Sequence, residues 1–76
     1  MFFVVKKTVK LNPNEEYMTL NVLLKITGVI PTGGMAKVFL ASHPVMVNGE
    51  PENRRGRKLY NGDTIVIGQT TYSVTK

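Results

Sequence analysis

Residues 32–49 read TGGMAKVFLASHPVMVNG, and the hydrophobic pattern of this stretch changes from helical to extended at Pro44. Before the proline, three apolar residues have the i, i+3, i+4 spacing of one helix face: Ala36, Phe39 and Leu40. The helix must end there, because proline disfavours helical geometry at the residue before it. Residues 45–47 then form a short apolar segment that runs into Asn48-Gly49, a strong hairpin-turn signal. The stretch therefore predicts a short helix followed directly by β-structure.

A second short helix is predicted upstream, between Thr19 and Gly28. Thr19 is a favourable N-cap residue, and Gly28 suits the left-handed conformation that closes a helix. The apolar face of this helix again has the i, i+3, i+4 spacing and consists of Leu20, Leu23 and Leu24. We expect Thr32-Gly33-Gly34 to open the helix that follows.

The remaining segments favour strands. The N-terminal segment alternates before Asn12-Pro13-Asn14 breaks it, which predicts a half-buried strand with one face formed by Phe3, Val5, Val9 and Leu11. Residues 50–58 are polar and irregular, and residues 59–60 form a candidate brief strand. Residues 64–67 and 71–74 are rich in β-branched side chains and predict two further strands. The fold class is therefore α+β, with two short helices packed on one face of a small, mostly antiparallel sheet.

The 76 residues predict a single domain over residues 1–76, in which residues 1–12 add an extra N-terminal strand. Ten Lys and Arg against five Asp and Glu give a net charge of +5, which favours a polyanionic partner such as nucleic acid. The chain contains no Cys, which excludes disulfides, thiolate catalysis and cysteine-ligated zinc. Its apolar stretches are far shorter than a membrane span, so we expect no membrane partner and a cytoplasmic location.

The densest charge lies at Arg54, Arg55, Arg57 and Lys58, with Gly56 among them. Arginine presents a planar fork of donors that matches phosphate oxygens, and a glycine lets a ligand approach the backbone. This run predicts a phosphate-binding loop. The alternative is a solvated charge run that forms surface ion pairs with Glu50 and Glu52.

The second candidate site is the start of the later helix. Thr32, Gly33 and Gly34 would offer free N–H groups to an anion there, with Lys37 beside them and Lys25 reaching in from the first helix. The alternative is an ordinary junction between a loop and a helix. We expect this helix start and the arginines to form one cationic patch. Tyr60 adjoins the basic run and is a candidate for base stacking, although a partly buried role is the alternative.

In combination, several pieces of the chain resemble the alpha-L RNA-binding motif, also called the S-four domain after ribosomal small-subunit protein four. The resemblance spans residues 18–67, which we take as the motif core, and the basic run resembles a stand-alone subfamily of short bacterial proteins. The pieces that carry it are Leu20 to Gly28, Thr32 to Lys37 with Phe39-Leu40, Val45 to Glu50, Gly62-Asp63-Thr64-Ile65, and Asn53 to Leu59.

The resemblance implies a non-catalytic module that binds structured RNA, either rRNA or tRNA-like, through the two helices and the adjoining loop. Many members carry an arginine where the first helix opens and another before the second helix, whereas this chain has Asn21 and Gly33. These departures weaken the expected contacts at both positions, and the basic loop is expected to supply part of the affinity.

We therefore predict an RNA-binding protein that has no enzymatic activity, no cofactor and no metal site. A ribosomal particle is one candidate partner, and the oligomeric state stays open. One alternative is a protein-interaction adaptor, in which the lysines of the N-terminal strand dock on an acidic partner: Lys6, Lys7 and Lys10. Binding of duplex DNA is the other alternative.

Overall fold

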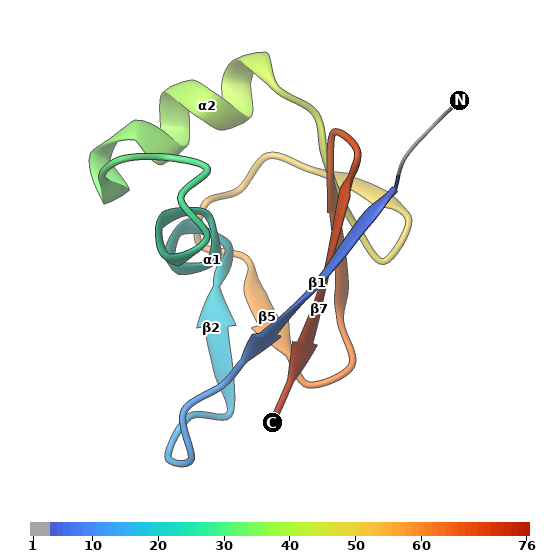
Figure 1. The fold of residues 1–76 in the computed structure, drawn as a ribbon. Helices are drawn as coiled ribbons and strands as arrows, with labels where there is room; N and C mark the ends of the chain where they lie inside the picture. The colour runs from blue at the N-terminus through green and yellow to red at the C-terminus, as the bar shows by residue number, and fades with distance from the viewer. Residues whose placement is uncertain (1–3) are drawn as a thin grey trace.

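The computed structural model describes residues 4–76, which form two helices, a short 3-10 turn and seven strands (Figure 1). The elements of the first half are β1 (Val5–Lys10), β2 (Tyr17–Thr19), α1 (Leu20–Ile26), the 3-10 turn η1 (Gly33–Met35) and α2 (Ala36–Ser42). The second half is entirely β and contains β3 (Val45–Val47), β4 (Glu50–Glu52), β5 (Lys58–Tyr60), β6 (Thr64–Ile67) and β7 (Thr70–Thr75). The predicted α+β class, with two small helices and a mostly antiparallel sheet, is confirmed.

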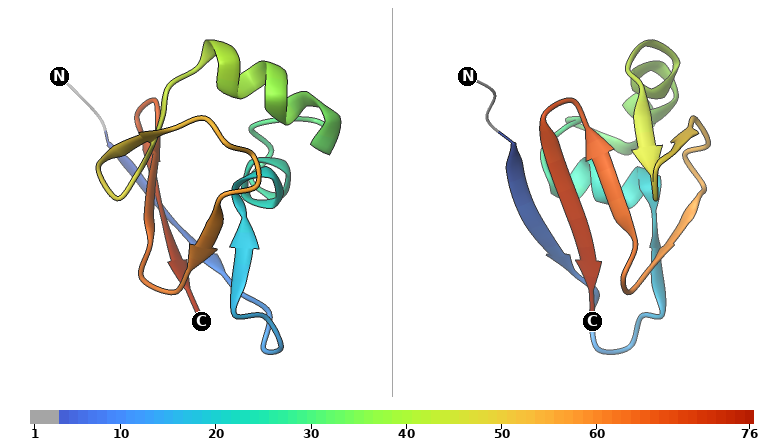
Figure 2. Two further views of the ribbon diagram at one scale, coloured as in Figure 1. Left: turned by 180° about the vertical axis from the view of Figure 1, so that it is seen from behind. Right: turned by 90° about the vertical axis from the view of Figure 1, so that its right-hand side faces the viewer.

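Five strands form the larger sheet, in the order β1-β7-β6-β3-β4. Every pair in it is antiparallel except β1 and β7, which run parallel from Val5 opposite Thr70 to Lys10 opposite Thr75. The remaining strands, β2 and β5, pair with each other in a separate antiparallel ribbon. Both helices lie to one side of the larger sheet, with α1 beside the ribbon and α2 beyond it (Figures 1 and 2).

The core fills the space between the helices and the strands. Its apolar side chains come from nearly every element, which is how a chain of this size buries enough surface to fold. The largest fully buried side chains are Leu11, Leu20, Leu23, Leu24, Val45, Val47, Leu59, Ile65 and Val74. The predicted helix faces are therefore confirmed as core, with Ala36 and Leu40 of α2 buried as well and Phe39 packed against them.

Local chemistry accounts for the ends of α1. The hydroxyl of Thr19 accepts a hydrogen bond from the backbone N–H of Val22 at 3.3 Å, as expected for an N-cap. Gly28 has φ of +79°, in the left-handed region, and it follows the last turn directly. Asn48 and Gly49 also have positive φ, at 51° and 83°, which fits the tight turn predicted between β3 and β4.

Four details differ from the sequence prediction. The ribbon strand β2 was not predicted, and the segment expected to be irregular contains β4, which pairs with β3. Val5 is exposed instead of sharing a buried face with Val9 and Leu11, and it lies at the start of β1, an edge strand of the sheet. Phe3 lies outside the described residues. The second helix begins with η1, and its α-helical part starts only at Ala36.

Across residues 4–76, no helix is long and apolar enough to cross a membrane.

Candidate nucleic-acid interface

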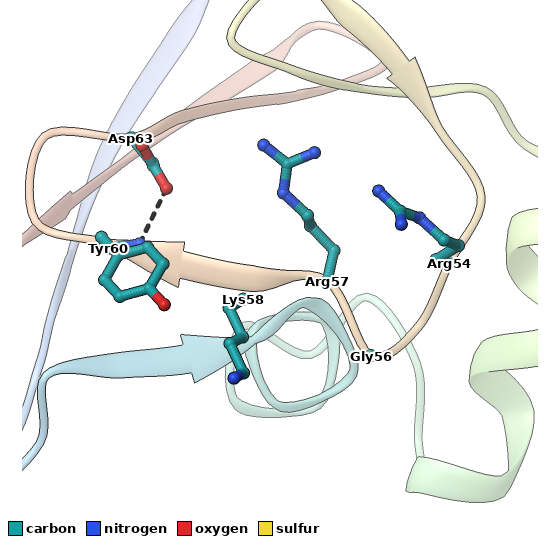
Figure 3. A pocket seen from close by; sticks show the side chains of 6 residues that line it. All are labelled: Arg54, Gly56, Arg57, Lys58, Tyr60 and Asp63. Atoms are coloured by element: carbon teal, nitrogen blue, oxygen red, sulfur yellow. Dashed lines mark hydrogen bonds between the residues drawn. The ribbon is translucent and has the colours of Figure 1, made fainter.

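An open groove lies beside strand β5, between the loop that follows β4 and the turn that follows β5 (Figure 3). Its volume is about 590 Å³, within the roughly 300–1,000 Å³ range of small-molecule sites. Three of its side chains are cationic. The residues that line it are Arg54, Gly56, Arg57, Lys58, Tyr60 and Asp63.

Glu52 fixes two of these cations in place. Arg54 binds its carboxylate with two N–H groups, from Nε to Oε2 and from Nη2 to Oε1, both at 3.0 Å. Arg57 donates from Nη1 to Oε1 at 2.9 Å. The Glu52 side chain is only 6% exposed, whereas those of Arg54 and Arg57 are 72% and 32% exposed. The anion is therefore buried behind two cations that still reach solvent.

The electrostatics of Glu52 agree with this geometry. Hydrogen bonds from the side chain of Arg54 lower the pKa of Glu52 most; those from the Arg54 backbone and from Arg57 add to this effect, while burial opposes it. The pKa of Glu52 falls to about 2, so the carboxylate is ionised at neutral pH. The same contact raises the pKa of Arg54. One buried acid thus serves as a permanent anchor for two arginines.

The loop between β4 and β5, residues 53–57, is also held by the first helix. The carbonyl of Arg57 accepts the N–H of Leu20 at 2.8 Å, and the carbonyl of Arg55 accepts the N–H of Asn21 at 2.9 Å. These N–H groups lie at the start of α1, where a helix has no internal partners for them. The loop therefore caps α1, and its backbone is held at both ends.

Donor capacity remains after these contacts are made. Each guanidinium has five N–H donors, of which Glu52 takes two from Arg54 and one from Arg57. Residues 52–58 carry four positive charges and one negative charge. The segment therefore stays strongly cationic. The alternative, a solvated charge run with surface ion pairs to Glu50 and Glu52, holds only in part: Glu52 forms ion pairs, and Glu50 forms none within the described chain.

Asp63 contributes a second carboxylate to the groove, with a structural role. Its Oδ2 accepts the backbone N–H of Tyr60 at 2.7 Å (Figure 3), and its Oδ1 accepts the side-chain amide of Asn48 at 3.1 Å. Asn48 in turn accepts the N–H of Thr64 at 2.9 Å. Asp63 therefore ties the turn after β5 to the β3–β4 hairpin.

The start of the second helix lies on the other side of Asn21. A side-chain carbon built on Gly33 would meet the amide of Asn21 at 3.6 Å, and the backbone of Asn21 bonds the arginine loop. The Oδ1 atom of Asn21 is buried without a hydrogen-bond partner in the described chain. Asn21 of α1 thus lies next to both predicted halves of the cationic patch, and the arginine loop bonds α1, not α2.

The structure separates the predicted site residues into three groups. Arg54, Arg57, Lys58 and Tyr60 meet in the groove, with the exposed Arg55 on the loop beside it. Thr32, Gly33, Gly34 and Lys37 lie at η1 and the first turn of α2, and Thr32 makes no side-chain cap there. Lys25 lies in the last turn of α1, at the opposite end of that helix from the arginine loop.

Sequence reasoning missed two residues at this surface. Glu52 enters the sequence analysis only in the alternative interpretation, as the partner of a surface ion pair, yet it is the buried anchor of the loop. Tyr17 was not singled out, yet its ring lies 5.7 Å from that of Tyr60 between centroids. The position of Tyr17 beside Tyr60 could have been found only by recognising that β2 pairs with β5. Within residues 4–76, no cluster of three or more His, Asp or Glu side chains offers a metal site.

Comparisons with known proteins agree with this architecture. The family model described as S4 domain matches residues 9–75. Among curated proteins, the Bacillus subtilis (strain 168) protein named "Probable ribosome maturation protein RlbA" is 60% identical over 52 residues. The aligned segment covers 68% of this chain and 73% of that protein. The chain therefore belongs to the S4 domain family.

Proposed function

We propose that this protein is a non-catalytic RNA-binding module that recognises structured RNA, either rRNA or tRNA-like, in the cytoplasm. The observation that carries the proposal is the pair of guanidinium groups fixed on buried Glu52 at the rim of an open groove. Guanidinium groups that are already held in position before binding lose little conformational freedom when they bind phosphate. Arg54, Arg55, Arg57 and Lys58 would contact the RNA backbone.

Membership of the S4 domain family and the name of the similar B. subtilis protein support the same direction. We infer that the RNA belongs to a ribosomal particle or to one of its precursors. Phosphate contacts supply affinity without reading sequence, so specificity would come from the shape of the RNA.

The start of the second helix extends the proposed surface. Thr32, Gly33, Gly34 and Lys37 lie across Asn21 from the arginine loop. We assign them to a neighbouring segment of the RNA backbone, because an extended ligand can follow the loop past α1. Lys25, at the far end of α1, would contribute only long-range attraction.

Arginine geometry favours nucleic acid over an acidic protein partner. A protein adaptor would be served equally well by the three lysines of β1, which are exposed on an edge strand. In the loop, by contrast, a buried carboxylate and several backbone hydrogen bonds hold arginine side chains in place. Their planar guanidinium groups match the geometry of phosphate oxygens. Competition between duplex DNA and structured RNA at matched salt separates the two nucleic acids.

The test compares two double variants that remove the same charge. Arg54→Ala with Arg55→Ala should weaken binding to a folded rRNA or tRNA fragment and lower the salt slope by up to about two units. Lys6→Ala with Lys7→Ala is the matched control and should leave the slope nearly unchanged. Circular dichroism checks that both variants fold. Equal losses in the two variants, or no loss in the arginine variant, would contradict the proposed site.

A further inference from the structure

We propose that Tyr17 and Tyr60 form a stacking site for an unpaired RNA base, placed beside the arginine groove. The inference rests on the proposed RNA-binding function and adds a ligand class to it: a strand junction or loop in which at least one nucleotide is free of base pairing. Four observations on the β2–β5 ribbon carry it, namely exposure, ring geometry, position and charge.

The two tyrosines lie on the outer face of the ribbon. Side chains alternate along a strand, so the inner face of β2 and β5 carries Met18 and Leu59, which are buried in the core. Tyr17 and Tyr60 are 39% and 46% exposed. Neither phenol hydroxyl forms a hydrogen bond within the described chain, so no polar partner there fixes these rings.

The two tyrosine rings contact each other across the ribbon. Tyr17 is directly opposite Tyr60 in the ribbon, their centroids are 5.7 Å apart, and the ring planes are tilted by 49°. The Nζ atom of Lys58 lies 5.0 Å from the centroid of the Tyr17 ring, a cation–π distance that also brings a positive charge to the aromatic surface. Exposed aromatic rings beside a cation suit a nucleobase and its phosphate together.

Position joins this aromatic pair to the phosphate groove. Tyr60 and Lys58 line the groove with Arg54 and Arg57, and Figure 3 shows the Lys58 side chain directed away from the two guanidinium groups. One nucleotide would then span both surfaces, with Tyr60 at their border. Tyr17 has acidic neighbours in Glu15 and Glu16, which border the hollow on its other side. Their charge disfavours phosphate there. The charge distribution therefore orients the ligand, with its backbone toward the arginines and its base toward the tyrosines.

The experiment uses two RNA probes of equal length and charge: a hairpin with an unpaired loop and a fully paired duplex. Tyr17→Leu and Tyr60→Leu should each weaken hairpin binding about tenfold and weaken duplex binding much less, because the duplex offers no free base to the rings. Tyr17→Phe and Tyr60→Phe keep the ring and should restore wild-type affinity. Circular dichroism verifies the fold of each variant.

A second measurement needs no variant. The chain contains no Trp, and its third tyrosine, Tyr72, is buried. Tyrosine fluorescence should therefore be quenched by the hairpin and much less by the duplex, because stacking brings a base against the exposed rings.

The outcomes distinguish failure of the stacking site from failure of RNA binding. Wild-type binding that is equal for hairpin and duplex, with no selective quenching, would overturn the stacking site while leaving RNA binding in place. Equal losses for both probes in the leucine variants would overturn it too. If the wild-type protein binds neither probe at low salt, the proposed function itself fails.

Discussion

Two regions of this small protein carry the same net charge and differ in every other respect. The arginine loop with its anchor, residues 52–58, has four cations and one acid, and the row of lysines on β1 has three cations: Lys6, Lys7 and Lys10. In the loop, a buried carboxylate holds two of the four cations, Arg54 and Arg57, and the start of α1 holds the backbone. On β1, the lysines project from an exposed edge strand and form no ion pair in the described chain.

The difference separates charge from organisation. Flexible ammonium groups on an edge strand protect it from pairing with other chains, and they need no defined position for that purpose. Fixed guanidinium groups present donors at set positions and pay less entropy when a ligand binds. Net charge alone would therefore give both regions the same role, whereas under the proposed function the loop serves recognition and the strand serves solubility.

Charge reversal gives the largest expected contrast. Arg55 is exposed and has no carboxylate partner within residues 4–76, so Arg55→Glu should leave the fold intact. We expect RNA affinity to fall roughly ten- to a hundredfold at low salt, because one phosphate contact becomes a repulsion. Lys7→Glu makes the same charge change on β1 and should cost less than about threefold through long-range screening alone. Filter binding at 50 mM salt compares the two variants, and similar losses would show that only total charge matters.

Removing the Glu52 carboxylate, the anchor of the arginine loop, should lower the stability of the fold. Glu52→Gln removes the charge that binds Arg54 and Arg57, and we expect the free energy of unfolding at pH 7 to fall by about 1–3 kcal/mol. Glu50→Gln, at the exposed start of the same strand, should change it by less than about 0.5 kcal/mol. Urea unfolding measures both. Equal effects would mean that the Glu52 contacts add nothing beyond surface charge.

Glu52→Gln should also change how the free energy of unfolding depends on pH. The pKa of Glu52 is lowered from 4.5 to about 2 in the folded protein, so its stabilisation is complete above about pH 4.5 and is lost as the pH falls toward 2. Glu52→Gln should therefore show a flatter loss of stability across this interval than the wild type. An unchanged acid unfolding curve would contradict the assigned anchor role.

Glycine substitution gives the smallest effect and probes the groove wall. A side-chain carbon on Gly56 would meet nothing within 4 Å, so Gly56→Ala should change stability by less than about 0.5 kcal/mol. If the RNA backbone passes close to Gly56, the added methyl group should weaken binding several-fold. Gly49→Ala is the contrasting variant, because its φ of +83° should cost about 1–2 kcal/mol in the left-handed region. Unchanged RNA affinity in Gly56→Ala would place the backbone of the ligand elsewhere.

Local signals in the sequence were sufficient for much of the fold. The cap at Thr19, the left-handed Gly28 and the Asn48-Gly49 turn each depend on neighbouring residues only, and the structure contains all three. The helix faces followed from spacing for the same reason. The basic loop was also visible, because arginine and glycine cluster within five positions.

Features that depend on distant partners were not predictable in this way. Strand β2 has only three residues, and it exists because Tyr17 to Thr19 pair with β5 far along the chain. The burial of Glu52 depends on two arginines that fold back over it, which no local pattern signals. Tyr17 was missed for the same reason, since its importance comes from its neighbour across the ribbon.

The parallel pairing of β1 with β7 has a consequence for how the chain matures. Val5 is opposite Thr70, so β1 can pair with β7, its only sheet neighbour within the described residues, only after more than sixty further residues have been synthesised. Contacts so distant in sequence slow folding, because a long loop must close before they form. The lysines of β1 would then act before this pairing forms, because their charge keeps the unpaired strand in solution until β7 has been synthesised.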